Sequence, residues 1–240
     1  MKMIPVTVLT GFLGSGKTTL LSHLLRHPDM GRTAVIINEF GEMGLDHELV
    51  ETSEEDFVEL TTGCLCCRLR DDLVLTLHDL LARRRREEVT AFEQIVIETT
   101  GLADPAPILQ TLASDVALAE TLKLANVVTT VDALLGLETL TRFSESARQV
   151  AVADKLVLTK TDLVDDDGQR LLSNVRKLNP WAPLHSAVNG RIAPSLLMGS
   201  TQEQVDPLRW LGQSVFDGVQ PKSAQQNAND SGSGPHGSAI

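Results

Sequence analysis

The sequence has few cysteines, no excess of positive charge and no long apolar run. Its three cysteines, at positions 64, 66 and 67, are odd in number and too close together to link distant loops, which excludes a disulfide scaffold and favours a reducing compartment. The formal net charge of -11 disfavours binding to nucleic acid or to an anionic membrane, because both partners are negative. No segment approaches the roughly 20 apolar residues of a membrane span, and residues 1–10 lack the charged region and cleavage site of a secretory signal. We therefore expect a cytoplasmic protein that binds no nucleic acid and no membrane.

A chain of 240 residues that is 42% hydrophobic can bury one substantial core. Apolar, β-branched runs alternate with stretches of helical period, which predicts an α/β fold with a mostly parallel sheet covered by helices on both faces. The expected strands are 4–10, 33–38, 57–61, 94–99, 125–131, 155–159 and 181–185, and the expected helices are 17–27, 69–86, 107–122, 144–153, 166–178 and 207–212. We expect residues 1–216 to form this domain. Residues 217–240, rich in Gln, Asn, Ser and Gly, are typical of a linker or disordered tail.

A glycine-rich loop follows the first expected strand. Residues 11–18 read Gly-Phe-Leu-Gly-Ser-Gly-Lys-Thr, the spacing of a phosphate-binding P-loop. In such a loop Lys17 would neutralise the β and γ phosphates and Thr18 would ligate Mg²⁺. The alternative is a glycine-rich turn with a solvated lysine, but the strand before the loop and the amphipathic helix after it favour phosphate binding. The predicted nucleotide-binding residues here are Gly11, Gly14, Ser15, Gly16, Lys17, Thr18 and Thr19.

An acidic residue ends the expected strand 94–99. Glu98 follows three apolar residues and precedes Thr-Thr-Gly101. We predict that Glu98 acts on Mg²⁺ through a water and that the Gly101 N–H senses the γ phosphate. Taken alone, Glu98 is better explained as a helix-capping carboxylate, but the P-loop upstream favours the catalytic role. The predicted catalytic residues are Lys17, Thr18 and Glu98.

The segment Thr159-Lys-Thr-Asp162 stands at the end of another buried strand, where α/β sheets place ligand groups. The Asp162 carboxylate can accept hydrogen bonds from guanine N1–H and the 2-amino group, whereas adenine offers no such donor pair. Lys160 would lay its stem along the base, and Ser186 with Ala187 could close the pocket over the guanine oxygen. The alternative is an ordinary loop in which Asp162 caps a helix. The position of the segment favours guanine, and hence GTP.

The cysteines form one cluster, Gly-Cys64-Leu-Cys66-Cys67. Three cysteines placed at random would fall so close together only on the order of a few times in ten thousand, so the cluster needs a chemical reason. Metal binding is the simplest one, because Cys64 and Cys67 have the two-residue gap of zinc chelates and soft sulfur suits Zn²⁺, and to a lesser degree Co²⁺. The competing interpretations are a redox thiol pair and three buried cysteines that act as small hydrophobic residues.

Together these motifs resemble the family of P-loop GTPases that includes the cobalamin-synthesis protein CobW and related metallochaperones. Five ordered segments carry the resemblance, namely residues 5–19, 38–42, 64–67, 98–105 and 159–162. Position 159 is Thr where most GTPases have Asn. The resemblance implies a P-loop NTPase fold with GTP-dependent delivery of zinc or cobalt to a client metalloprotein or metal-insertion enzyme. It also implies that Glu39 and Glu42 lie in a mobile switch segment and that the cysteines are metal ligands. A nucleotide that orders this segment could bring Glu42 toward the cysteines, and we predict Glu42 as a further ligand.

Members of this family usually continue into a smaller C-terminal domain, which we expect to be absent from these 240 residues, through natural loss or because the sequence is a fragment. A second hypothesis remains open. A P-loop kinase or other NTPase that acts on a small molecule could carry the same motifs, with the cysteines as a structural zinc site. The physiological metal, the client and the oligomeric state are left open by the sequence.

Overall fold

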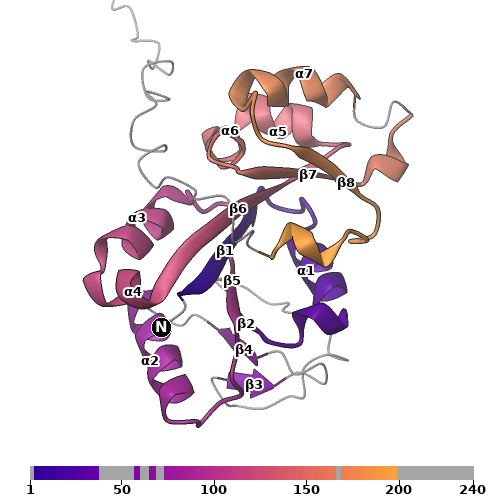
Figure 1. Ribbon diagram of the computed structural model, residues 1–240. Coiled ribbons are helices and arrows are strands. Elements are labelled where there is room, and N and C mark those ends of the chain that lie inside the picture. The colour runs from indigo at the N-terminus through magenta and orange to yellow at the C-terminus, as the bar shows by residue number, and fades with distance from the viewer. Residues whose placement is uncertain (1–2, 38–56, 60–64, 69–72, 166–168, 199–240) are drawn as a thin grey trace, which may run out of the picture.

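The computed structural model describes residues 3–37, 57–59, 65–68, 73–165 and 169–198. Within these residues one eight-stranded sheet runs through the molecule in the order β3-β4-β2-β5-β1-β6-β7-β8 (Figure 1). Every neighbouring pair is parallel except β3 with β4, which is antiparallel. The strands are β1 Ile4–Gly11, β2 Thr33–Ile37, β3 Phe57–Glu59, β4 Leu65–Arg68, β5 Gln94–Glu98, β6 Leu122–Asp132, β7 Lys155–Thr159 and β8 Leu184–Ala187.

Helices connect the strands and lie on both faces of the sheet. The α-helices are α1 Lys17–Leu25, α2 Leu73–Arg85, α3 Ala106–Ser114, α4 Val116–Thr121, α5 Gly136–Arg142, α6 Ser144–Ala151 and α7 Gln169–Leu178. Short 3₁₀ helices lie at η1 Pro28–Met30, η2 Thr161–Leu163 and η3 Pro194–Leu196. The prediction of an α/β fold with a mostly parallel, doubly covered sheet is confirmed.

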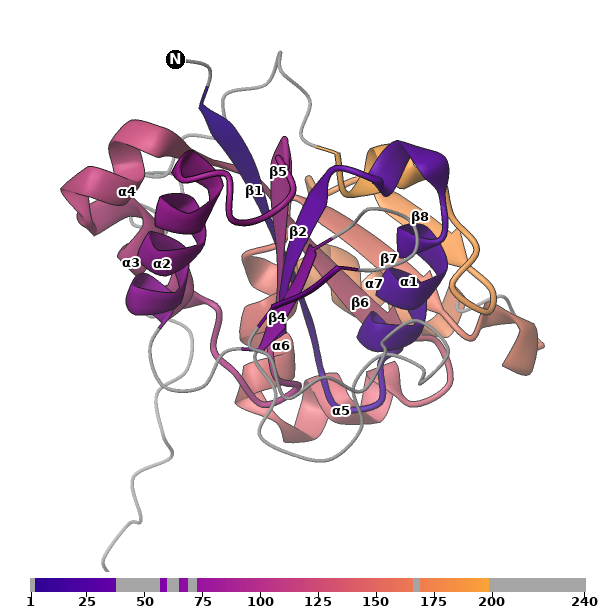
Figure 2. The same ribbon diagram turned by 90° about the horizontal axis from the view of Figure 1, so that it is seen from below.

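Each face of the sheet has its own hydrophobic layer. On one face, α2, α3 and α4 pack over the strands around Val8 and Ile97, and the layer continues under α6 and α7. On the other face, α1 and η3 pack over Leu9 and Val96. Figures 1 and 2 show α1 on the opposite side of the sheet from α2, α3 and α4. Strand residues alternate between the layers, as expected for a sheet buried on both faces.

Several predicted elements differ from the structure in their limits. The expected helix 107–122 is two helices, because Asp115 is extended and its carboxylate accepts a hydrogen bond from the Leu118 N–H at 2.9 Å, which starts α4 anew. The expected strand 181–185 was misplaced: β8 begins after Pro183, whose missing N–H makes it a poor residue inside a sheet. Strand β4 and helix α5 were not predicted. The expected helix 207–212 and the expected tail 217–240 lie outside the described residues.

Among the described residues, no helix has the length and apolar character needed to cross a membrane.

Candidate nucleotide-binding site

Most of the predicted nucleotide-binding residues lie at or just after the carboxyl ends of three strands, β5, β1 and β7. β5, β1, β6 and β7 are adjacent and parallel, so the loops that follow them meet at one edge of the sheet. The P-loop follows β1, Gly101 follows β5, and Lys160 and Asp162 follow β7. The structure thereby brings together segments that are up to about 150 positions apart in the sequence.

The P-loop owes its shape to glycines in conformations that other residues avoid. Gly14 and Gly16 have φ of 69° and 89°. A Cβ at Gly11 would lie 2.3 Å from Thr130 Oγ1 and 2.5 Å from the Thr130 carbonyl oxygen, so no larger residue fits beside β6. Gly16 precedes α1, whose first residue is Lys17, and this order directs the N-terminus of α1 into the loop. The backbone has the form that phosphate binding requires.

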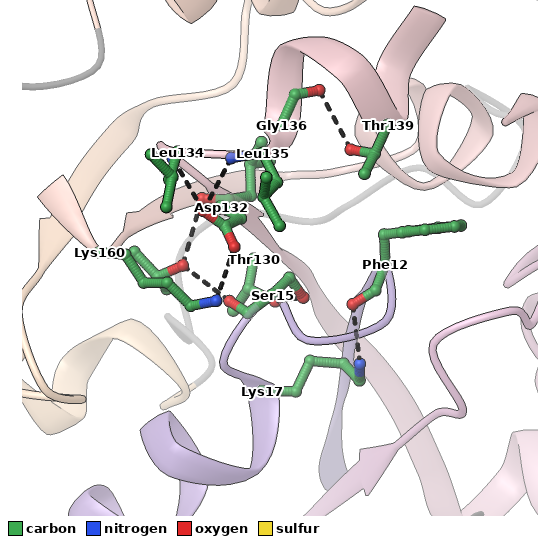
Figure 3. Close-up of polar contacts among 12 residues, drawn as sticks. Phe12, Ser15, Lys17, Thr130, Asp132, Leu134, Leu135, Gly136, Thr139 and Lys160 are labelled. Atoms are coloured by element: carbon green, nitrogen blue, oxygen red, sulfur yellow. Dashed lines mark hydrogen bonds and ion pairs between the residues drawn. The ribbon is translucent and has the colours of Figure 1, made fainter. Parts of the chain in front are cut away.

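Lys17 is held inside this loop. Its ammonium donates to the carbonyl oxygens of Gly11 at 3.0 Å and Phe12 at 3.2 Å, and only 6% of the residue is exposed. Figure 3 shows the side chain directed back toward Phe12. The solvated lysine of the alternative interpretation is therefore wrong. A buried ammonium that is surrounded by glycine-rich backbone can neutralise phosphate oxygens at short range.

Thr18 and Glu98 form the second part of the site. The Thr18 hydroxyl donates to Glu98 Oε1 at 2.6 Å, and Glu98 is fully buried at the end of β5. The contact joins α1 to the central sheet next to the P-loop. A hydroxyl and a carboxylate side by side are the hard oxygen groups that suit Mg²⁺, so the residues present fit the predicted magnesium site. Because Thr18 is the second residue of α1, this contact places Glu98 at the helix N-terminus, a position that the magnesium role and the helix-capping alternative share.

Gly101 lies against the P-loop. A Cβ at this position would be 2.6 Å from the Leu13 backbone nitrogen and 2.7 Å from Leu13 Cα, so only glycine allows the two loops to approach this closely. The Gly101 region and the P-loop thus form one continuous surface at the sheet edge, as a sensor of the γ phosphate needs. Thr19 is exposed and contributes no buried contact to this surface.

The end of β7 is tied to the P-loop through Thr159. Its hydroxyl donates to the Ser15 carbonyl oxygen at 2.7 Å, and Ser15 Oγ lies 2.7 Å from Thr130 Oγ1. Thr159, in place of Asn, therefore makes a direct link between the base-binding segment and the phosphate loop. Asp162 follows on η2 with its side chain exposed at the same edge, where a base could reach it.

Lys160 has a partner that was not predicted. The residue adopts the left-handed conformation, with φ 57°, and its ammonium donates to Asp132 Oδ2 at 2.7 Å (Figure 3). Asp132 ends β6, is largely buried, and also accepts hydrogen bonds from the N–H groups of Leu134 and Leu135 at 2.8 and 3.1 Å. Its position at the carboxyl end of a buried strand was the signal that could have identified it. Asp132 holds the Lys160 stem beside the proposed base site.

Ser186 and Ala187 lie in β8 rather than in a loop after it. β8 pairs with β7 so that Leu158 lies opposite Ser186 and Thr159 opposite Ala187. The two residues are therefore next to Leu158 and Thr159, and their closing of a pocket over the guanine oxygen stays a prediction. His185 precedes them, and partial desolvation, followed by the positive charge of Lys155, lowers the pKa of its imidazole.

The metal-binding prediction falls partly outside the described residues. Glu39, Glu42 and Cys64 are not described, whereas the backbone of Cys66 and Cys67 lies in β4. β4 is parallel to β2, with Cys67 opposite Ile36, and Ile36 is opposite Ile97 of β5. Two strand spacings, roughly 10 Å, therefore separate the Cys67 backbone from the strand that ends at Glu98.

Comparison with known proteins agrees with this geometry. Residues 5–186 match the family model described as CobW/HypB/UreG, nucleotide-binding domain. The chain belongs to this family. Its resemblance to CobW-like P-loop proteins is thereby confirmed, and so is the nucleotide-binding nature of the domain.

Curated relatives within the family carry names that refer to zinc. The chain is 40% identical over 200 residues to the zinc chaperone YjiA of Escherichia coli, and the match spans 83% of this chain and 62% of that protein. It is 35% identical over 198 residues to the zinc-regulated GTPase metalloprotein activator 1 of Schizosaccharomyces pombe, with 79% of this chain and 47% of that protein covered. The chain thus spans about half to three fifths of the length of these relatives.

Solved structures of other proteins also resemble this chain. The chain resembles the crystal structure of Zn(II)-bound YjiA GTPase from E. coli with a TM-score of 0.71 and 38% identity, over 83% of this chain and 62% of that chain. It also resembles HypB from Helicobacter pylori in complex with nickel, with a TM-score of 0.53 and 18% identity, over 80% of this chain and 81% of that one. The second likeness is one of fold alone.

Proposed function

We propose that this chain is a GTP-hydrolysing metallochaperone domain that binds zinc or cobalt at its cysteine cluster and transfers the metal to a client metalloprotein. The observation that carries the proposal is the shared sheet edge. β4, which contains Cys66 and Cys67, runs parallel to β2 and leads to the same edge as the P-loop and Glu98. Relatives at 35–40% identity are named for zinc and for GTP hydrolysis, which supports both halves of the proposal.

The nucleotide half rests on three groups that act on the phosphates. Lys17, held in the P-loop, compensates charge on the β and γ phosphates, and the Gly101 N–H lies where it can meet a γ oxygen. Thr18 and Glu98 would hold Mg²⁺, which supplies charge neutralisation between the β and γ phosphates when bound. Asp162 and Lys160 select and cover the guanine base. No Gln follows Gly101 in the next three positions to orient a water, so we expect slow hydrolysis.

The metal half rests on Cys64, Cys66 and Cys67, with Glu42 as a further ligand. Thiolates bind Zn²⁺ and Co²⁺ strongly, and Glu42 belongs to the segment that follows β2. β2 ends at Ile37, which lies opposite Glu98, so this segment starts beside the phosphate site. A nucleotide that orders the segment can therefore change the ligand set of the metal. Hydrolysis would relax the segment and release the metal to the client.

The competing function is a kinase or other NTPase with a structural zinc site. One experiment separates the two: the purified chain is loaded with zinc and mixed with a coloured zinc chelator, and GTP or ATP is added without any acceptor. We expect phosphate release from GTP at about 10⁻² per second or slower, accompanied by transfer of zinc to the chelator. ATP should give neither. Zinc that stays bound through GTP turnover, or a preference for ATP, would favour the competing function.

A further inference from the structure

Two neighbouring residues of helix α6 contact the loop that follows β5. Gln149 Nε2 donates to the carbonyl oxygens of Gly101 at 3.1 Å and Ala103 at 2.9 Å. Arg148 forms an exposed ion pair with Asp104 at 3.3 Å. The buried contact is the stronger constraint, because exposed ion pairs contribute little. Hydrogen bonds from a helix that is remote in sequence therefore hold the loop that carries the proposed γ-phosphate sensor.

The buried amide of Gln149 has one orientation. Gln149 is fully buried, and two carbonyl oxygens face its nitrogen, so the reversed amide would place oxygen against oxygen. Its Oε1 has no hydrogen-bond donor among the described residues. Gln149 lines a small cavity together with Phe12, Leu13 and Ser15 of the P-loop. A buried acceptor without a donor is unfavourable. A glutamine that bears this cost indicates that its two N–H donors are the groups that the position requires.

We propose that Gln149 is a positioning residue for γ-phosphate recognition: its amide fixes the Gly101 loop against the P-loop, where the Gly101 N–H can meet the γ phosphate. Fixing the Gly101 carbonyl restrains the peptide that follows the residue, and Gly101 lies so close to Leu13 that a Cβ would be 2.6 Å from the Leu13 nitrogen. GDP lacks the γ phosphate, so the anchor should affect GTP and hardly affect GDP. This inference rests on the proposed function as a GTPase.

The test compares Gln149→Met, which keeps the length of the side chain and removes both donors, with the wild type. Binding of a nonhydrolysable GTP analogue and of GDP is measured by fluorescence titration. We expect the analogue to bind about 10-fold more weakly in the variant, as the loss of two buried hydrogen bonds implies, with GDP changed less than about 2-fold. Gln149→Asn, which keeps the amide but withdraws it by one methylene, should shift the same ratio in the same direction.

Thr129→Val is the matched control. The Thr129 hydroxyl donates to the Gln149 carbonyl oxygen at 2.7 Å and is buried, so its loss destabilises the same part of α6 without touching the amide. It should lower the melting temperature and leave the analogue-to-GDP ratio unchanged. If the analogue-to-GDP ratio is unchanged in the two Gln149 variants, whether both nucleotides bind more weakly or neither does, the inference about Gln149 is wrong. The proposed function as a GTPase is not affected by that result. A wild type that prefers adenine nucleotides would overturn the proposed function, and this inference with it.

Discussion

Lys17→Ala should reduce GTP hydrolysis by roughly 10²–10³-fold while the protein remains folded. The wild-type ammonium lies inside the P-loop and is 6% exposed, so it meets the phosphates in a region where water screens charge weakly. Alanine removes this positive charge at the γ phosphate. We expect the fold to survive because the hydrogen bonds that the variant loses to the backbone carbonyls of Gly11 and Phe12 contribute about 1 kcal/mol each. Phosphate release and a thermal melt measure the two effects.

Lys155→Ala is the matched control for this experiment. Its ammonium also donates to a backbone carbonyl, that of Leu196 at 3.0 Å, but it stands at the start of β7, away from the phosphate edge. We expect hydrolysis in this variant to stay within about 2-fold of the wild type. Wild-type turnover in Lys17→Ala would mean that the glycine loop is not the phosphate site.

Asp162→Ala should weaken GTP binding by about 100-fold and ATP binding by far less. Guanine offers N1–H and the 2-amino group to the carboxylate, and hydrogen bonds to a charged acceptor are stronger than neutral ones. Lys160 and Thr159 stay in place, because their contacts are with Asp132 and the P-loop. Competition titrations with both nucleotides measure the difference.

Asp165→Ala offers a control in the same loop, since this exposed carboxylate is three positions further on. It removes one negative charge near the site without removing the proposed base contact. Selectivity for GTP over ATP should persist in this variant. If Asp162→Ala weakens GTP and ATP equally, the guanine assignment is wrong.

Local patterns were enough to predict the residues of the proposed phosphate site. Lys17 and Thr18 belong to one short motif between a strand and a helix, and the periodicity of both elements is visible in the sequence. Glu98 was likewise predicted from its immediate neighbours, because it ends an apolar strand. The structure confirms that these residues meet, because parallel strands place their carboxyl ends together.

Contacts between remote positions could not be predicted in the same way. Lys160 and Asp132 are 28 positions apart, and Gln149 and Gly101 are 48 apart. A glutamine in a helical pattern gives no sign that it is fully buried, since most glutamines are exposed. Strand β4 was missed because two of its four residues are cysteines, which were assigned to a metal site rather than to a strand. The limits of α4 and β8 depended on Asp115 and Pro183, whose capping and strand-breaking roles were recognisable signals in the sequence.

The coupling between nucleotide and metal is the central claim, and equilibrium zinc affinity tests it most directly. The affinity is measured by competition with a chelator for the nucleotide-free, GDP-bound and nonhydrolysable-GTP-bound protein, and again for Cys66→Ala. We expect the GTP analogue to tighten zinc binding by roughly 5–150-fold over the GDP state, with zinc tightening the analogue by the same factor. Cys66→Ala should weaken zinc binding and reduce this difference. Equal zinc affinity in all three states would contradict the claim and make the metal site structural.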